Sequence, residues 1–317
     1  MKTTPQVSVP DYGNNNGIVY FHNNPPSFLS KILQSYMGIV NFREKMEKRI
    51  VRGDFKTEPA PVPRRFKKKF QIEDNKFADR NYWTLKPANK QSEKVIIYIH
   101  GGAYISNIIP QHWSLIGALT DKTNATVIVP NYQTAPYATY REVYDFIDSL
   151  YKSLLGKYKP ENITFMGDSA GAGLALGYAM YLRDNDMPQP SRIILLSPWL
   201  DITMSNPGIR DLEKLDKMLA VKGLVMAGEL YARDISKTDY RVSPIYGDLN
   251  NLGRISVFIS TYDLCYADAR KLHESLTGNN ITHNYFEYPG MFHAWVAVTS
   301  LKESMHALSQ ISDLIGN

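Results

Sequence analysis

A series of short, unbroken apolar runs rich in β-branched residues constrains the fold of this chain most strongly. Strands buried on both faces of a parallel sheet read as continuous apolar runs, whereas strands with one face in water alternate apolar and polar residues. The pattern therefore predicts a parallel sheet covered on both faces. The predicted strands are Val95–Ile99, Thr126–Val129, Ile163–Met166, Arg192–Leu196, Ile255–Ile259 and His283–Tyr288.

Segments with helical spacing separate these runs, and strands that alternate with helices are typical of a doubly wound α/β fold. Two earlier segments, Lys68–Glu73 and Tyr82–Lys86, are short and partly alternating. They predict antiparallel strands at a sheet edge, which brings the expected sheet to eight strands. The predicted helices between and after the strands are Trp113–Lys122, Thr139–Tyr158, Ala172–Arg183, Ala267–Thr277 and Lys302–Ile315.

Two regions do not fit this alternation. Residues 1–26 are rich in Asn and Pro and predict a loose leader. In Ser27–Arg52, apolar residues recur at helical spacing, which predicts one or two amphipathic helices. Almost sixty residues separate Leu196 from Ile255, more than one crossover needs, and they include the helix-like stretches Ile209–Met218 and Lys222–Arg233.

We expect these helices to form a cap over the carboxyl ends of the strands, where ligands bind in open α/β sheets. The predicted organisation is a leader with cap helices over residues 1–66 and an α/β domain over residues 67–317. A cap insertion is placed within that domain at about residues 203–242.

The pentapeptide Gly167-Asp168-Ser169-Ala170-Gly171 lies where the predicted strand Ile163–Met166 gives way to a helix of small residues. A strand, a sharp turn and a helix form the setting of a nucleophile elbow. Such a turn strains the backbone of the central Ser and lifts its hydroxyl clear of the sheet, and glycines on either side let strand and helix pass closely. The motif alone is weak, but motif and setting together predict that Ser169 is a nucleophile.

A serine hydroxyl needs a base to remove its proton, and the base needs an orienting carboxylate. In folds with this elbow the chain order is Ser, then acid, then His. Asp263 follows the predicted strand Ile255–Ile259, and His293 follows the last strand. Asp268 competes with Asp263, but a place at the start of a helix explains it as a capping residue.

A third motif, His100-Gly101-Gly102-Ala103-Tyr104, directly follows the strand Val95–Ile99. Attack on an ester carbonyl places negative charge on its oxygen, so backbone N–H groups must already point at that position. Adjacent glycines alone could form a plain tight turn. Together with a downstream elbow they predict an oxyanion hole.

Composition excludes several other classes. The single cysteine, Cys265, rules out an intrachain disulfide and a Cys-based metal site, and packing explains it better than nucleophilic catalysis. Phosphate-loop and metal-ligand spacings are absent, so neither metal nor cofactor is predicted. No segment approaches the roughly 18 apolar residues of a signal or membrane span, which favours a cytoplasmic protein without stable membrane insertion. The basic run Arg64–Lys69 could bind nucleic acid. A solvated stretch that leads into an edge strand is the simpler interpretation, so no nucleic-acid partner is expected.

These residues resemble the hormone-sensitive-lipase-like esterases of the α/β-hydrolase fold. The likeness rests on His100–Tyr104 and Gly167–Gly171, with further echoes in Ser197-Pro198-Trp199-Leu200-Asp201 and Ser243-Pro244-Ile245-Tyr246-Gly247. It extends from about Lys68 to the C-terminus.

The resemblance implies hydrolysis of carboxylic esters with Ser169 as nucleophile, His293 as base and Asp263 as orienting acid. It implies an oxyanion hole made by the N–H groups of Gly102, Ala103 and Ala170. The loop is supported by His100 and Gly101, and Asp168 either tunes the nucleophile or fixes the elbow. Ala103 stands where the family usually has a third glycine, and Tyr104 and Trp199 either line the substrate pocket or pack in the core.

Three functions follow from this pattern. The first is an esterase acting on small to medium acyl chains of a small-molecule ester, because a cap leaves little room for a polymer. The second is an amidase, deacetylase or small peptidase with the same triad. The third is a binding protein without turnover, which an intact set of Ser169, Asp263 and His293 disfavours. A homodimer is left open.

Overall fold

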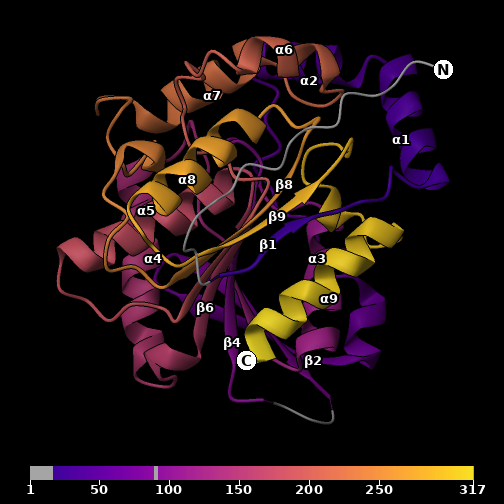
Figure 1. Cartoon of the computed structure of the whole chain (residues 1–317). Coiled ribbons are helices and arrows are strands. Elements are labelled where there is room, and N and C mark those ends of the chain that lie inside the picture. Colours follow the sequence, from indigo (N-terminus) through magenta and orange to yellow (C-terminus); the bar gives the residue numbers. More distant parts are fainter. Residues whose placement is uncertain (1–16, 89–91, 317) are drawn as a thin grey trace.

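The computed structural model describes residues 17–88 and 92–316, and these residues build one sheet flanked by helices (Figure 1). The described part of the chain contributes nine strands in the order β1-β9-β8-β7-β6-β4-β5-β3-β2. Neighbours from β1 to β5 in this order run parallel, whereas β3 pairs antiparallel with β5 and β2 antiparallel with β3. The strands are β1 Val19–Phe21, β2 Phe70–Phe77, β3 Arg80–Pro87, β4 Val95–Ile99, β5 Thr126–Pro130, β6 Ile163–Asp168, β7 Arg192–Leu196, β8 Arg254–Ser260 and β9 Asn284–Tyr288.

The helices between the strands cover both faces of the sheet, as the unbroken apolar runs predict. Alternate residues of one strand enter different cores: Ile97 packs on the α4 and α5 side, and Ile96 packs on the α3 and α9 side. The α-helices are α1 Phe28–Ile39, α2 Phe42–Val51, α3 Pro110–Thr123, α4 Tyr140–Leu155, α5 Ala170–Asp184, α6 Ile209–Leu215, α7 Val221–Ala232, α8 Tyr266–Gly278 and α9 Lys302–Gly316. Four short 3₁₀ helices complete the described elements: η1 Arg64–Lys68, η2 Pro160–Asn162, η3 Pro244–Tyr246 and η4 Trp295–Ala297.

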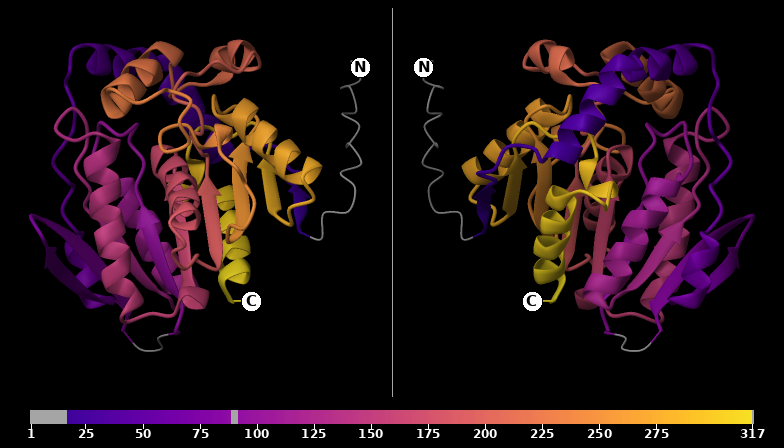
Figure 2. Two further views of the ribbon diagram at one scale, coloured as in Figure 1. Left: turned by 90° about the vertical axis from the view of Figure 1, so that its left-hand side faces the viewer. Right: turned by 90° about the vertical axis from the view of Figure 1, so that its right-hand side faces the viewer.

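Helices α1, α2, α6 and α7 lie together above one end of the sheet (Figures 1 and 2), and we call them the upper helices. They come from two distant parts of the chain: α1 and α2 precede the edge strand β2, and α6 and α7 lie between β7 and β8. Contacts join α1 to α2 and α2 to α7. This arrangement supports a cap, and the predicted domain boundaries themselves stay a prediction.

The expected count of eight strands was one short, because β1 lies inside the stretch predicted to be a loose leader. Its three residues pair with β9 from Val19↔Tyr285 to Phe21↔Glu287. The Asn284 side chain also accepts a hydrogen bond from Ile18 N–H at 2.9 Å. A strand this short has no detectable sequence period, and the partner that stabilises it lies more than 260 residues away in the sequence.

The basic run forms η1 and leads directly into the edge strand β2. Phe66 is buried in its middle while Arg64, Arg65, Lys67, Lys68 and Lys69 are exposed. Lys69 pairs with Asp121 of α3. This position agrees with a solvated stretch that flanks an edge strand.

Candidate active site

Ser169 occupies the sharp turn between β6 and α5, with φ of +51° and ψ of −121°. Residues other than glycine rarely adopt such angles, at a cost of about 1–3 kcal/mol, so the surrounding structure must hold the turn in place. Two backbone hydrogen bonds do so: Ser169 N–H donates to Leu196 O at 2.9 Å, and Trp199 N–H donates to Ser169 O at 3.0 Å. The elbow is therefore fixed by the chain that leaves the neighbouring strand β7.

The two glycines of the motif are required by the close passage of β6, α5 and the end of β4. A Cβ at Gly167 would lie 2.5 Å from the carbonyl carbon of Gly171. A Cβ at Gly171 would lie 2.1 Å from Ile99 O and 2.5 Å from His100 O. Both distances are too short for any side chain, and the obstacle in both cases is backbone that cannot move aside.

The Asp168 carboxylate ties the elbow to the glycine-rich loop. It is buried and accepts three hydrogen bonds: from Tyr98 Oη at 2.5 Å, from Gly101 N–H at 2.9 Å and from His112 Nε2 at 3.2 Å. Gly101 has to be glycine here, because a Cβ would lie 2.4 Å from Asp168 Oδ2. This geometry favours the structural alternative for Asp168 over direct tuning of the nucleophile.

These donors also keep the buried carboxylate ionised. Ile109 N–H donates to His112 Nδ1 at 3.1 Å, so Nε2 carries the proton that points at Asp168. Burial alone would raise the pKa of Asp168, but His112, Tyr98 and the Gly101 N–H together lower it below its usual range. Asp168 thus presents a permanent negative charge that organises the loop around it.

The loop after β4 turns through three successive residues with positive φ: Gly102 at +119°, Ala103 at +53° and Tyr104 at +61°. Gly102 is required, because a Cβ would lie 2.4 Å from Ser106 O. Within the described part of the chain, the N–H groups of Gly102, Ala103 and Ala170 donate to no protein acceptor. N–H groups without a protein acceptor are available as donors for the predicted oxyanion hole.

His100 supports the loop from inside. Its Nδ1–H donates to Gly101 O at 2.8 Å. Its ring stacks on the Tyr132 ring with the two centroids 4.3 Å apart, and its backbone carbonyl accepts a hydrogen bond from Tyr132 Oη at 2.7 Å. Burial, followed by the nearby His112, lowers the pKa of His100 to about 3. The ring is therefore neutral, as a buried supporting residue should be.

His293 and Asp263 meet beyond the carboxyl ends of β8 and β9. His293 Nδ1 lies 2.9 Å from Asp263 Oδ1 and 3.0 Å from Oδ2, and both side chains are buried. Burial alone would lower the pKa of His293, but the charge and hydrogen bond of Asp263, with smaller contributions from Asp216 and Asp168, raise it above its usual value. Because Nδ1 donates to Asp263, a neutral His293 has its free lone pair on Nε2.

The two further sequence echoes lie directly beneath this pair. Ser197 Oγ accepts from Ala294 N–H at 3.0 Å and so holds the residue after His293. The segment after β7 also meets the segment before β8, since Ser243 Oγ accepts from Ile202 N–H at 3.0 Å and Tyr246 Oη donates to Asp201 at 2.9 Å. Both echoes are structural: they hold the loops that carry Ser169 and His293.

Asp216, which follows α6, brings a second buried carboxylate next to Asp263. Its oxygens accept from Met218 N–H at 2.6 Å, from Leu219 N–H at 2.9 Å and from Leu264 N–H at 2.8 Å. Burial and the charge of Asp263 raise the pKa of Asp216 to about 6, although His293 and the two N–H groups from its own loop act in the opposite direction. The residue that follows α6 therefore holds the loop of Asp263 and adds negative charge near His293.

Cys265 and Asp268 take no direct part in this pair. Asp263, Cys265 and His293 form a group whose potential ligand atoms lie within 4.8 Å of one another. His293 Nδ1 is already bonded to Asp263, and burial, followed by the charge of Asp263, raises the pKa of Cys265 far above its usual value. A thiol kept protonated is a poor metal ligand. Asp268 lies in α8 and accepts from Asn206 Nδ2 at 2.8 Å.

Tyr104 and Trp199 belong to an aromatic cluster beside the elbow. Tyr104 stacks on Tyr231 of α7 with ring centroids 3.7 Å apart, and Trp199 lies 5.5 Å from Tyr104. Trp199 Nε1 donates to Asp201 O at 2.9 Å, so its polar edge is already satisfied within the core. The Tyr231 hydroxyl is buried without a hydrogen-bond partner among the described residues. The cluster narrows the space near Ser169, and its role as a pocket wall stays a prediction.

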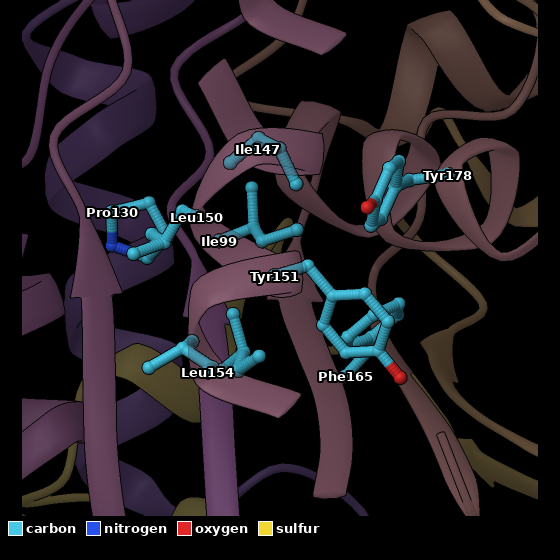
Figure 3. Close-up of a pocket in the computed structure, with 9 residues that line it drawn as sticks. Ile99, Pro130, Ile147, Leu150, Tyr151, Leu154, Phe165 and Tyr178 are labelled. Carbon is cyan, nitrogen blue, oxygen red and sulfur yellow. The ribbon is translucent and has the colours of Figure 1, made fainter. Parts of the chain in front are cut away.

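A separate gap lies beneath α4 (Figure 3) and is not the candidate site. Side chains of α4, including Ile147 and Leu154, face Ile99 of β4 and Phe165 of β6 across it, with Tyr178 of α5 at one side. The lining is apolar and the gap has no room for a water molecule. It is a small packing defect of the core, and its apolar lining does not include Ser169, Asp263 or His293.

Three residues in this site have no signal in the sequence. Tyr98 lies within an apolar strand run, His112 begins a helix, and Asp216 lies 47 positions before Asp263 in a stretch of ordinary polar composition. Each acquires its role only through contacts between distant segments. A search for polar residues within otherwise apolar runs would have found Tyr98 alone.

We predict that Asp168→Asn destabilises the fold by about 2–4 kcal/mol, because the amide presents one oxygen to three donors and its own NH₂ faces them. Urea unfolding measures the loss. Asp148→Asn is the matched control, since Asp148 also accepts from a tyrosine, Tyr178 Oη at 3.2 Å, but pairs with exposed Lys152 near the surface. Equal stability of the Asp168 variant and the parent would contradict the organising role of this carboxylate.

Comparison with known proteins gives a consistent family. Residues 96–297 match the model of a family described as having the alpha/beta hydrolase fold. An esterase of Acinetobacter venetianus is 31% identical over 234 residues, which cover 71% of this chain and 76% of that protein. An acetyl-hydrolase of Streptomyces hygroscopicus is 28% identical over 212 residues, covering 67% and 71% of the two chains.

Solved structures agree with this assignment. One from Staphylococcus aureus superposes with a TM-score of 0.77 at 28% identity, covering 85% of this chain and 90% of the other. An esterase of the bacterial hormone-sensitive-lipase family superposes with a TM-score of 0.74 at 21% identity, covering 86% and 89%, and shows the shared fold. The chain therefore belongs to the α/β-hydrolase fold family, among the carboxylic ester hydrolases.

Proposed function

We propose that this protein cleaves carboxylic esters through an acyl-enzyme on Ser169, with His293 as general base and Asp263 as the orienting acid. The observation that carries the proposal is the pair formed by His293 and Asp263. Because Asp263 occupies Nδ1 at 2.9 Å, the imidazole is held in the tautomer whose Nε2 can accept a proton. The strained elbow supplies the nucleophile, and the related esterase and acetyl-hydrolase support the same chemistry.

In the first half of the reaction, Ser169 Oγ attacks the carbonyl carbon as its proton passes to His293 Nε2. The resulting oxyanion accepts hydrogen bonds from the N–H groups of Gly102, Ala103 and Ala170, which have no protein acceptor within the described residues. His293 then gives the proton to the leaving alcohol oxygen. In the second half, His293 takes a proton from water and the hydroxide attacks the acyl-enzyme. His293 then returns that proton to Ser169 Oγ as the carboxylic acid leaves, and the acid ionises in water.

Buried aromatic rings beside the elbow support a preference for small to medium acyl chains. Tyr104, Trp199 and Tyr231 pack closely there, and the methyl of Ala103 occupies space that a third glycine would leave open. An ester series graded by acyl length tests this preference.

No helix in the described ranges combines the length and apolar character needed to cross a bilayer. A cytoplasmic location and a homodimer stay predictions.

An amidase, deacetylase or small peptidase with the same residues is the second candidate, because one nucleophile can attack both carbonyl types. The acetyl-hydrolase relative keeps this alternative relevant. Matched p-nitrophenyl esters and anilides separate the two. Appreciable anilide cleavage without an ester preference would favour the amidase.

We predict that Ser169→Ala lowers kcat for a p-nitrophenyl ester on the order of a millionfold, because no other group replaces the acyl-accepting oxygen. A fluorophosphonate probe should label the parent and leave the variant unlabelled. Thermal unfolding of the variant serves as the folding control. Residual turnover within tenfold of the parent would refute the assignment of the nucleophile, and folded parent that resists the probe would favour a protein without turnover.

We predict that Asp216→Asn moves the acid limb of the pH profile of kcat/KM to lower pH by up to about one unit. Only neutral His293 can act as the base, so activity falls as the pH drops through its pKa. Asp216 contributes to raising that pKa, and removal of its charge lowers it. Asp211→Asn, the same change at an exposed position of α6, should leave the limb in place. A limb that stays fixed or moves to higher pH in Asp216→Asn would contradict this coupling.

A further inference from the structure

Helix α1 is apolar on two opposite sides, which is unusual for a helix at the surface. Its inner side is Ser30, Leu33, Gln34 and Met37, spaced as one helical face. Ser30 Oγ donates to Glu303 of α9 at 3.0 Å, and Gln34 Nε2 donates to Gly290 O at 2.9 Å. Leu33 and Met37 pack on the core beside α3 and α9. These contacts settle how the helix attaches to the molecule.

The outer side carries a row of exposed apolar side chains. Phe28 and Ile39 are each 80% exposed, Tyr36 is 60% exposed and Ile32 is 46% exposed. Their spacing of four, four and three residues places them on one line about 17 Å long. Leu29, 43% exposed, flanks the row. The water-facing side of a surface helix is normally polar, so this row has the character of a contact surface.

The segment that forms α1 and α2 carries an excess of positive charge. Between residues 28 and 52 the chain has six Lys and Arg side chains and two Glu side chains. Of these cations, Lys31, Lys45 and Arg52 are exposed and form no ion pair with any residue that the structure describes. Helix α1 itself has no acidic residue. An apolar row edged by unpaired cations matches the composition of helices that lie in the surface of an anionic bilayer.

We propose that the outer side of α1 docks the protein onto an anionic lipid surface, with Phe28, Ile32, Tyr36 and Ile39 entering the acyl boundary and Lys31 and Lys45 meeting lipid phosphates. This is peripheral binding, distinct from a membrane span. A second copy of the chain fits less well, since a two-fold contact would bring the same cations together. Five side chains on one short helix also fall short of the roughly 800 Å² that each partner of a stable dimer buries.

Docking through α1 would place the reacting residues close to the lipid. Through Gln34, α1 is bonded to the loop of Gly290, three residues before His293. Esters dissolved in the bilayer are then the substrate class that reaches the site, an extension that rests on the proposed function. The docking surface itself requires no catalytic residue.

Cosedimentation with vesicles tests the proposal. We use vesicles of phosphatidylcholine alone or mixed with phosphatidylglycerol, and the Ser169→Ala protein, so that lipid hydrolysis cannot alter the result. We expect binding to the mixed vesicles. The double variant Phe28→Ser/Ile39→Ser should weaken it by at least about tenfold, and Lys31→Glu/Lys45→Glu should abolish the preference for the anionic lipid.

Tyr137→Ser is the matched control, since Tyr137 is 68% exposed and lies between β5 and α4, outside α1. It should bind vesicles as the parent does. In an otherwise active background, thermal unfolding and turnover of a short water-soluble ester should stay unchanged in all these variants. Binding that survives Phe28→Ser/Ile39→Ser would overturn the proposal. A parent protein that does not bind the mixed vesicles would also overturn it. If that parent sediments as a dimer and Phe28→Ser/Ile39→Ser sediments as a monomer, the row is a contact between two copies of the chain.

Discussion

One buried charge, the carboxylate of Asp168, is the constraint around which the active-site end of the sheet is arranged. It lies at the last position of β6, immediately before the strained serine, and it accepts a hydrogen bond from Gly101 N–H in the loop that follows β4. Two parallel neighbours in the sheet, β4 and β6, are therefore joined at their carboxyl ends by a charged hydrogen bond as well as by their ladder. The proposed oxyanion donors Gly102 and Ala103 follow β4 and the proposed nucleophile follows β6, so this contact sets the distance between them.

The same constraint explains why certain glycines cannot be replaced by any residue with a side chain. Gly101 must leave room for the Asp168 carboxylate, and Gly171 must leave room for the carbonyls of Ile99 and His100. Gly101 and Gly171 therefore serve each other's segments, since Gly101 lies against Asp168 and Gly171 lies against Ile99 and His100. Ala103, in contrast, carries its methyl at φ of +53° in a half-exposed position, where the cost is backbone strain and no collision is involved.

The sequence is sufficient for the parts of the structure that depend on local pattern. Unbroken apolar runs predict the central strands, and the polar residues after them, Ser169, Asp263 and His293, fall at one edge because parallel strands end together. It is insufficient where a role depends on a distant partner. Strand β1 exists only because β9 offers a free edge, and His112 faces Asp168 only because α3 packs beside β4. Asp216 looks like any surface acid until the fold buries it beside Asp263.

The upper helices and the residue that follows α6 contact the loops of the candidate site from the side opposite the sheet. Asp216 binds the backbone of Leu264, Gln34 binds the carbonyl of Gly290, and Tyr231 stacks on Tyr104, so each loop of the site has one contact from above. A movement of these helices would consequently alter the charge near His293 and the space near Ser169 together. Because α1 carries both Gln34 and the outward apolar row, the proposed docking surface and the loop of His293 are joined through one helix.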